Sequence, residues 1–234
     1  MNTTTTTTHI PIQLKPEQQK EISSMSFPDR VRSFGLLDGK KKIMTSFHGS
    51  ELGLQFGPRT IHFGETTTPT EVAHRPVVTW PSAGGDGSCF YTLAMMDPDV
   101  PNKDHPTKAQ FLHWLVLNIP SPCGTGSGSP NLYAPPPSQF MQMIDSAADN
   151  VVEFFPSAPP KGSGLHRYVF ALYRHPVRID FREKKIAAQV LKGREKWSMN
   201  DFAERHNLGA PVFLNMYLAE YDPIVDRHYE IASG

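Results

Sequence analysis

The sequence predicts a mainly β protein, an antiparallel sandwich or barrel with a few short peripheral helices. The 234 residues include 17 glycines and 22 prolines, a content that suits a loop-rich β protein better than a helical bundle. From Phe27 onward, short apolar runs alternate with glycine and proline, which is typical of short strands joined by turns. The length fits one domain with a single sizeable core.

The N-terminal segment differs in composition from the rest of the chain. Residues 1–24 are polar and include six consecutive threonines, so we expect a disordered tail followed by one domain at 25–234. The tail lacks the apolar block of a signal peptide and any stretch long enough to span a membrane.

Charge and cysteine content limit the classes of partner. Lys plus Arg equals Asp plus Glu at 23 each, so the net charge gives no reason to expect nucleic acid as a partner and allows at most peripheral membrane contact. Cys89 lies in an apolar run and Cys123 in a loop rich in Gly, Ser and Pro, so we expect two reduced thiols. Reduced thiols favour a cytoplasmic location.

Three segments predict buried strands. Residues 88–96 are apolar at both parities, which indicates a central strand covered on both faces. Residues 111–119 form a second apolar run, and residues 212–221 a third.

Residues 121–157, which follow the expected strand at 111–119, predict an extended loop with one short helix inside it. Apolar residues fall at helical spacing between 140 and 147, with Ser138 as a possible N-cap. Two further helices have clear start signals, a capping box at Ser198 and an Asp222 cap followed by proline.

The first polar pattern follows the central strand directly. Asp97 and Asp99 are interleaved with Pro98 and Pro101, and proline fixes φ, so the two carboxylates lie in a stiff turn. We expect a cis peptide bond before Pro98 or Pro101, because tight functional turns are where that isomer occurs. His113 is the odd polar member of the next strand, so the two segments look like half of a polar pocket.

The second polar pattern begins a strand at His166. Residues two apart share a face of a strand, so His166 and Tyr168 point one way and Arg167 the other. Either histidine alone is more often a satisfied core residue than a ligand. Both together, each beside a proline-rich turn, indicate a shared site.

Five segments of the sequence carry a family resemblance, and they are TPTEVAHRP at 68–76, DPDVP at 97–101, FLHWLVLNIP at 111–120, PPKGSGLHRY at 159–168 and NLGAPV at 207–212. Together they resemble the phosphatidylethanolamine-binding protein family, which includes mammalian kinase-inhibiting members, a yeast carboxypeptidase inhibitor and plant flowering regulators. The similarity runs from about Phe27 to the C-terminus and implies a β-sandwich with a small pocket for phosphate-type anions, including the phosphoethanolamine head group.

The resemblance also implies roles for individual residues. Asp99 and Arg167 match the framing residues of the family signature, and Tyr229 matches the position that closes the pocket. Asp201 stands where kinase-inhibiting members carry a regulatory serine, so that switch is not expected. The loop at 121–157 is longer than in the short mammalian members. The ligand-binding residues implied are Asp97, Asp99, Pro101, His113, Pro159, Pro160, Gly164, His166, Arg167, Tyr168 and Tyr229.

The side chains of such a pocket fit an anion if Asp97 raises the proton affinity of an imidazole or meets the ligand's ammonium end. His113, His166 and Tyr168 then supply N–H and O–H donors. Protonated imidazoles bind phosphate more strongly, so we expect affinity to fall as pH rises through the histidine range.

We therefore expect an anion-binding module that regulates a kinase, a protease or another regulatory factor as a monomer, without a cofactor, a metal or catalysis. The alternative is a metal-dependent phosphoester hydrolase built on the Asp-x-Asp turn and the two histidines. Against catalysis, no serine or cysteine with a base partner can be picked out of the sequence.

Overall fold

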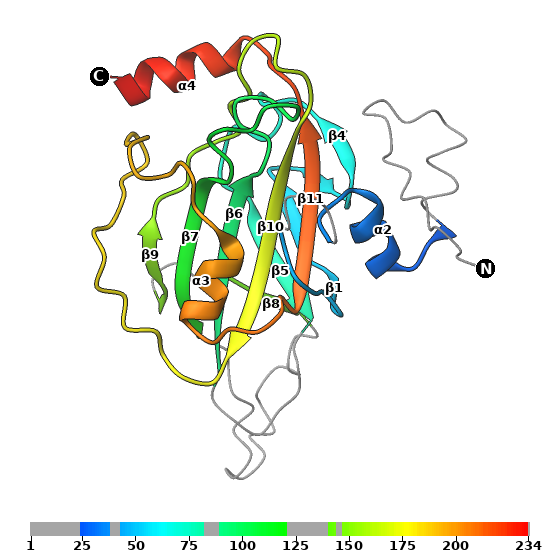
Figure 1. Cartoon of the computed structure of the whole chain (residues 1–234), viewed down its shortest axis with the longest axis vertical. Helices are drawn as coiled ribbons and strands as arrows, with labels where there is room; N and C mark the ends of the chain where they lie inside the picture. Colours follow the sequence, from blue (N-terminus) through cyan, green and yellow to red (C-terminus); the bar gives the residue numbers. More distant parts are fainter. Residues whose placement is uncertain (1–23, 38–42, 82–88, 121–139, 144–146, 234) are drawn as a thin grey trace, which may run out of the picture.

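Two β-sheets form a sandwich in the computed structural model, which describes residues 24–37, 43–81, 89–120, 140–143 and 147–233 (Figure 1). The larger sheet has seven strands; β1 and β4 both pair in parallel with β11, and the other pairings are antiparallel. Its strands are, in order across the sheet, β1 (Ser50–Glu51), β11 (Phe213–Ala219), β10 (His166–His175), β6 (Phe90–Asp97), β7 (Phe111–Pro120) and β9 (Asp149–Val152), with β4 (Glu65–Thr67) also beside β11. The predicted sandwich with peripheral helices is confirmed.

The smaller sheet has four antiparallel strands. They are, in order, β3 (Arg59–Ile61), β2 (Gly53–Phe56), β5 (Val77–Pro81) and β8 (Phe140–Gln142). One core cluster joins this sheet to the larger one, for example through Trp80, Met95 and Phe170. A second cluster covers the opposite face of the larger sheet and includes Ala94 and Val169. The strands β6 and β10 are therefore buried on both faces, as predicted for residues 88–96.

Three helices lie at the periphery of the described structure (Figure 1). The sequence did not predict α2 (Phe27–Ser33), although Ser26 caps it and a proline stands in its first turn. Both predicted start signals are confirmed: Ser198 caps α3 (Met199–Arg205), and Asp222 Oδ1 accepts a hydrogen bond of 3.0 Å from the first amide of α4 (Ile224–Ser233).

The helix expected between 138 and 147 is wrong. Residues 140–142 form β8, which pairs antiparallel with β5, so Met141 lies opposite Trp80. An open sheet edge offers these residues backbone hydrogen bonds that local periodicity does not reveal. The extended loop expected at 121–157 is also interrupted, because it contains β8 and β9.

Several sequence predictions lie outside the described residues, namely the polar tail to residue 23, Ser138 and Cys123. Cys89 is a buried free thiol, as expected. Within the described part of the chain, no helix is both long and apolar enough to cross a membrane.

Candidate functional site

The acidic turn follows β6 and is closed by its own backbone. Asp97 is the last residue of β6, and its Oδ1 accepts a hydrogen bond of 2.7 Å from the amide of Asp99. The peptide bond between Val100 and Pro101 is cis, which confirms the expectation for one of the two prolines. Both carboxylates are buried, each with a residue exposure of 1%.

Asp99 pairs with Arg167 and holds the turn against β10. Arg167 Nη2 donates to Asp99 Oδ1 at 2.6 Å, while its Nε and its backbone N–H donate to Oδ2 at 2.9 and 3.0 Å. Burial raises the pKa of Asp99, but the Arg167 hydrogen bonds and charge outweigh it, so the net pKa is lowered. Arg167 Nη1 also donates to the Phe34 carbonyl at 2.9 Å, just after α2. The expected framing pair is confirmed as a structural feature.

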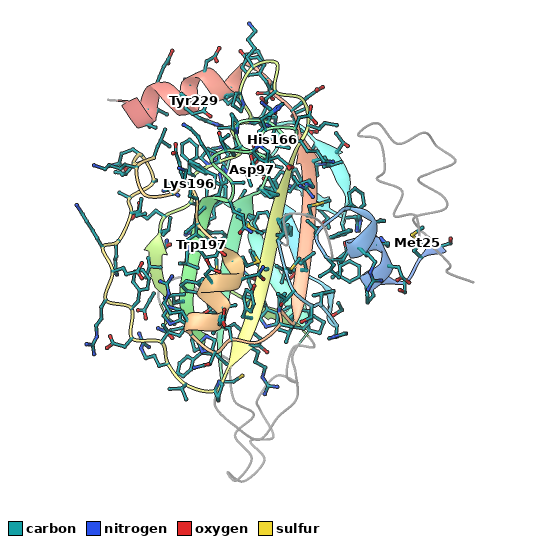
Figure 2. All side chains as sticks on the ribbon, viewed as in Figure 1. Met25, Asp97, His166, Lys196, Trp197 and Tyr229 are labelled. Atoms are coloured by element: carbon teal, nitrogen blue, oxygen red, sulfur yellow. The ribbon has the colours of Figure 1, made fainter. Side chains whose placement is uncertain are left out.

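Asp97 pairs with His166 at the start of β10 (Figure 2). Oδ2 of Asp97 lies 2.6 Å from Nδ1 of His166, and both side chains are buried. Burial lowers the pKa of His166, but the hydrogen bond and charge of Asp97 outweigh it and raise the net pKa above the usual histidine value. The carboxylate therefore fixes the ring and raises its proton affinity.

Ser163 determines which protons this pair holds. The Ser163 hydroxyl donates to the Pro160 carbonyl at 2.6 Å, since a carbonyl oxygen can only accept. Its oxygen must then accept from Nε2–H of His166, which lies 2.9 Å away. The ring carries a proton on Nε2, and a second proton is shared between Nδ1 and Asp97. Below the raised pKa the pair is an imidazolium and a carboxylate with no net charge.

The turn that supplies these groups is shaped by the residues predicted from the PPKGSG segment. Pro159 is buried, Pro160 is half-buried, and the Ser163 amide donates to the Pro160 carbonyl at 3.0 Å. Gly162 and Gly164 both have φ of 77°, a left-handed conformation that favours glycine.

His113 has a different protonation state from the one the sequence suggested. Its Nδ1 lies 2.9 Å from the Phe155 carbonyl, so Nδ1 carries the hydrogen and Nε2 keeps its lone pair. Burial lowers the pKa of His113 to about 3, and the charge of Arg194 adds to that. His113 is thus a neutral imidazole whose Nε2 accepts, so the expectation that both histidines donate to an anion is corrected for His113.

Tyr168 brings an unpaired hydroxyl to the same place. Its ring lies edge-on to His113, with centroids 5.2 Å apart, and stacks on Tyr217 at 5.2 Å. The hydroxyl is buried and its hydrogen has no acceptor among the described residues, although the backbone of Ala158 is close enough to oppose the rise in its pKa. Burial raises the pKa of Tyr168 well above 10, and the nearby charge of Asp97 adds to the effect. The group is therefore a neutral O–H donor.

The terminal helix covers the site. In Figure 2, Tyr229 on α4 lies beyond His166 and Asp97, at the end of the sheet where β6 finishes. The Tyr229 hydroxyl donates to the Ala158 carbonyl at 2.8 Å, and its ring lies 6.4 Å from that of Phe155. His113, His166 and Tyr168 are at most 2% exposed, so the site is closed in this conformation.

Sequence reasoning missed three residues that complete the site. Ser163 accepts from His166, Phe155 accepts from His113, and Arg194 donates to the His113 carbonyl at 2.9 Å. Only Ser163 had a sequence signal, since it lies inside the GSGLHRY segment. The other two are brought in by strand and loop packing.

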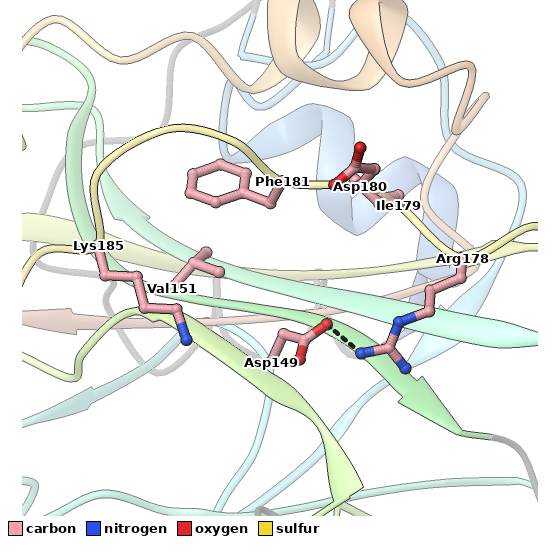
Figure 3. Close-up of a pocket in the computed structure, with 7 residues that line it drawn as sticks. All are labelled: Asp149, Val151, Arg178, Ile179, Asp180, Phe181 and Lys185. Atoms are coloured by element: carbon pink, nitrogen blue, oxygen red, sulfur yellow. Dashed lines mark hydrogen bonds and ion pairs between the residues drawn. The ribbon is translucent and has the colours of Figure 1, made fainter.

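A separate cavity of about 390 Å³ lies beside β9 (Figure 3). Asp149 and Arg178 form an ion pair of 2.6 Å in its wall, and Lys185 lines another side. Asp149 pairs with Leu117, six residues along β7 from Phe111, so this cavity is roughly 20 Å from the acidic turn. No sequence-predicted site residue lines it.

Comparison with known proteins places this arrangement in a family. A family model described as phosphatidylethanolamine-binding protein matches residues 46–217. A Drosophila melanogaster protein named as a candidate odorant-binding protein, A5, is 31% identical over 165 residues, which are 70% of this chain and 67% of the relative. A "26 kDa secreted antigen" of Toxocara canis is 31% identical over 179 residues, which are 76% of this chain and 59% of the antigen.

A solved structure has the same fold at lower identity. It is a carboxypeptidase Y inhibitor in complex with its cognate proteinase, with a TM-score of 0.63 and 22% identity over 86% of this chain and 99% of the inhibitor. The family model spans both the DPDVP turn and the GLHRY strand, which hold the Asp97–His166 pair. The chain belongs to the phosphatidylethanolamine-binding protein family.

Proposed function

We propose that this protein binds phosphate-type anions, including the phosphoethanolamine head group, at the site formed by Asp97, His113, His166 and Tyr168. The observation that carries the proposal is the buried Tyr168 hydroxyl, whose hydrogen has no acceptor among the described residues. A buried unsatisfied hydroxyl costs about 1–3 kcal/mol, and an anion oxygen would satisfy it. The Nε2–H of His166, which donates to Ser163 in this structure, becomes a second donor once a ligand oxygen takes the place of the Ser163 hydroxyl.

The acceptor at His113 fits the other parts of such a ligand. Its Nε2 lone pair accepts a hydrogen bond from the ammonium of ethanolamine or from a phosphate hydroxyl. The carbonyls that already accept from the surrounding side chains, such as Ala158 O from Tyr229, form the wall of the same site. A ligand enters this closed site by displacing the contact of α4 with that wall.

We infer further that the protein acts by binding a protein partner, such as a kinase, a protease or a regulatory factor. Support comes from the family and from a structural relative that is a proteinase inhibitor. A monomeric state and a cytoplasmic location remain predictions, which size-exclusion chromatography and cell fractionation test.

The hydrolase alternative has weaker support from the donor set. Asp97 accepts from Asp99 N–H and pairs with His166, and Asp99 is bound by Arg167. Neither carboxylate is oriented toward a shared metal position, and the described residues contain no group of three or more His, Cys, Asp or Glu side chains that could hold a metal ion. A phosphodiesterase assay with Mg²⁺, Mn²⁺ and Zn²⁺ tests this reading; turnover abolished by Asp97→Asn would establish it.

The binding proposal is tested by deleting one hydroxyl. Titration calorimetry with phosphoethanolamine and inorganic phosphate compares the native protein with Tyr168→Phe, and Tyr173→Phe serves as the matched control. Tyr173 is buried in the same strand but packs in the other core cluster. We expect Tyr168→Phe to weaken anion binding about tenfold or more, because a hydrogen bond to a charged group contributes about 1.5–3 kcal/mol.

The same variant separates binding from folding. Removing an unsatisfied buried hydroxyl leaves the stability of the free protein unchanged or higher, so the loss of affinity cannot come from unfolding. Equal anion affinity for the native protein and Tyr168→Phe, or no binding to either, contradicts the proposal.

A further inference from the structure

Arg194 is a fully buried cation beside the candidate site, with an exposure of 0%. Its guanidinium donates to backbone carbonyls, and no carboxylate of the described residues lies within ion-pair distance of it. The acceptors are Val190 O at 2.6 Å, Leu112 O at 3.2 Å, His113 O at 2.9 Å, Glu153 O at 2.9 Å, Ala187 O at 2.9 Å and Ala188 O at 3.4 Å.

Carbonyl dipoles solvate this charge without cancelling it. Arg167, the other arginine close to the site, is neutralised by Asp99 through two side-chain hydrogen bonds. Burial lowers the pKa of Arg194 to about 10, against an opposing effect of the carboxylate of Glu153, an exposed residue, so the group is still protonated at neutral pH. A buried cation without an ion-pair partner is costly, and perturbed buried groups of this kind cluster at functional sites.

The cation is close to where an anion would bind. The Arg194 guanidinium carbon lies 5.8 Å from the centre of the Phe155 ring, and the Phe155 ring stacks on His113 at 5.8 Å. The guanidinium is therefore within about 12 Å of the His113 ring. The material between them is an aromatic ring and buried backbone rather than water, so screening is weak.

The remaining buried charges at the site cancel in pairs. Asp97 is matched by the protonated His166, Asp99 is matched by Arg167, and His113 is neutral. Of these buried groups, Arg194 alone has no ion-pair partner among the described residues. The exposed Glu153 carboxylate acts on it from the solvent side, and the field of Arg194 reaches the space next to His113.

We propose that Arg194 sets the charge selectivity of the anion site and favours a doubly charged phosphate monoester over a singly charged phosphate diester. This inference rests on the proposed anion-binding function and names the preferred ligand class within it. A unit charge about 12 Å away in a medium of effective dielectric constant about 20 changes affinity about tenfold for each negative charge on the ligand. The monoester therefore gains about ten times more from Arg194 than the diester does.

The test compares methyl phosphate with dimethyl phosphate by calorimetry at pH 8, where the monoester is a dianion because its second pKa is about 6. The proteins are the native chain, Arg194→Gln, Arg194→Lys and the control Arg178→Gln. Arg178 is exposed, pairs with Asp149 and lies at the distant cavity (Figure 3). We expect the native protein to prefer the monoester by about tenfold or more. Arg194→Gln should lose about a factor of ten of that preference, whereas Arg194→Lys and Arg178→Gln should keep it.

The ratio of the two affinities distinguishes an electrostatic role from a structural one, because misfolding weakens both ligands alike. An unchanged ratio in Arg194→Gln, or a native protein that binds both ligands equally, overturns the inference. If Arg194→Gln does not fold, the inference is decided by two results: whether the native protein prefers the monoester, and whether Arg194→Lys keeps that preference. If the native protein binds neither ligand, the proposed function fails and the inference fails with it, whereas binding with an unchanged ratio overturns the inference alone.

Discussion

Replacing Asp97 by Asn should destabilise the protein by an amount that depends on pH. The native carboxylate is buried, accepts from the Asp99 amide and pairs with His166 at 2.6 Å. Breaking one partner of a buried ion pair costs about 3–5 kcal/mol, because the other group loses its compensation. For a chain of this size that loss lowers Tm by roughly 6–20 °C.

The sign of the pH dependence follows from His166. Its pKa is raised in the folded protein, so the stabilisation by the pair is fully present below the ordinary histidine pKa of about 6.5 and is lost as pH rises through the folded value. Over that window the native protein loses at most about 1.4 kcal/mol per pH unit through this one proton. In Asp97→Asn, burial is left to lower the pKa of His166, so the slope disappears.

Urea unfolding at pH 6, 7, 8 and 9 measures both effects. Asp180→Asn is the control, since it breaks an exposed pair with Arg182 that contributes about 0–1 kcal/mol. The difference between native and Asp97→Asn should be largest at pH 6 and should shrink toward pH 9. A difference that is the same at all four pH values would refute the assignment of the shared proton.

Three further predictions follow from the same site. Arg167→Lys should lower the free energy of unfolding by about 2–3 kcal/mol in urea titrations, because lysine cannot reproduce the forked contact with Asp99; a loss below 0.5 kcal/mol would show that the pair is dispensable. Tyr229→Phe removes the hydrogen bond to Ala158 and should speed anion association in stopped-flow experiments while costing about 1 kcal/mol or less of stability; unchanged association would mean that α4 does not limit entry. The His113 ring should stay neutral with its hydrogen on Nδ1 from pH 5 to 8 in ¹⁵N NMR spectra, and any titration in that range contradicts its burial.

The sequence predicted those parts of the fold that depend on neighbours along the chain. Alternation in β10 correctly separated the faces of Tyr168 and Val169, which pack in different core clusters. Capping side chains placed the starts of α3 and α4 for the same reason, since a cap acts within three residues. The apolar residues at both odd and even positions of 88–96 correctly predicted that β6 is a central strand. A strand with only one buried face has apolar residues at alternate positions, whereas a strand buried on both faces has them at every position.

The parts that were missed depend on partners far along the chain. Nothing within residues 140–142 reveals that β5 has a free edge with which they can pair. The helical spacing of the apolar residues therefore predicted a helix where the structure has β8. Arg194 reads locally as one more basic residue in an exposed, charged segment. Its guanidinium is buried against backbone carbonyls from distant parts of the chain. Those of β7 lie about 80 residues earlier in the sequence, and the carbonyl just after β9 lies about 40 residues earlier.

The charges of the site explain how the proposed anion pocket tolerates two aspartates. Residue types alone suggest that Asp97 and Asp99 would repel phosphate, and the histidines were expected to overcome this by both becoming protonated. In the structure, each aspartate has its own cationic partner: Arg167 neutralises Asp99, and His166 neutralises Asp97. His113 is a neutral acceptor, and the positive charge without an ion-pair partner among the described residues is that of Arg194. The pH dependence of anion binding that comes from the protein therefore belongs to a single proton, that of the Asp97–His166 pair, and its midpoint lies above the ordinary histidine range because Asp97 raises the pKa of His166. A phosphate monoester adds its own second ionisation, with a pKa of about 6.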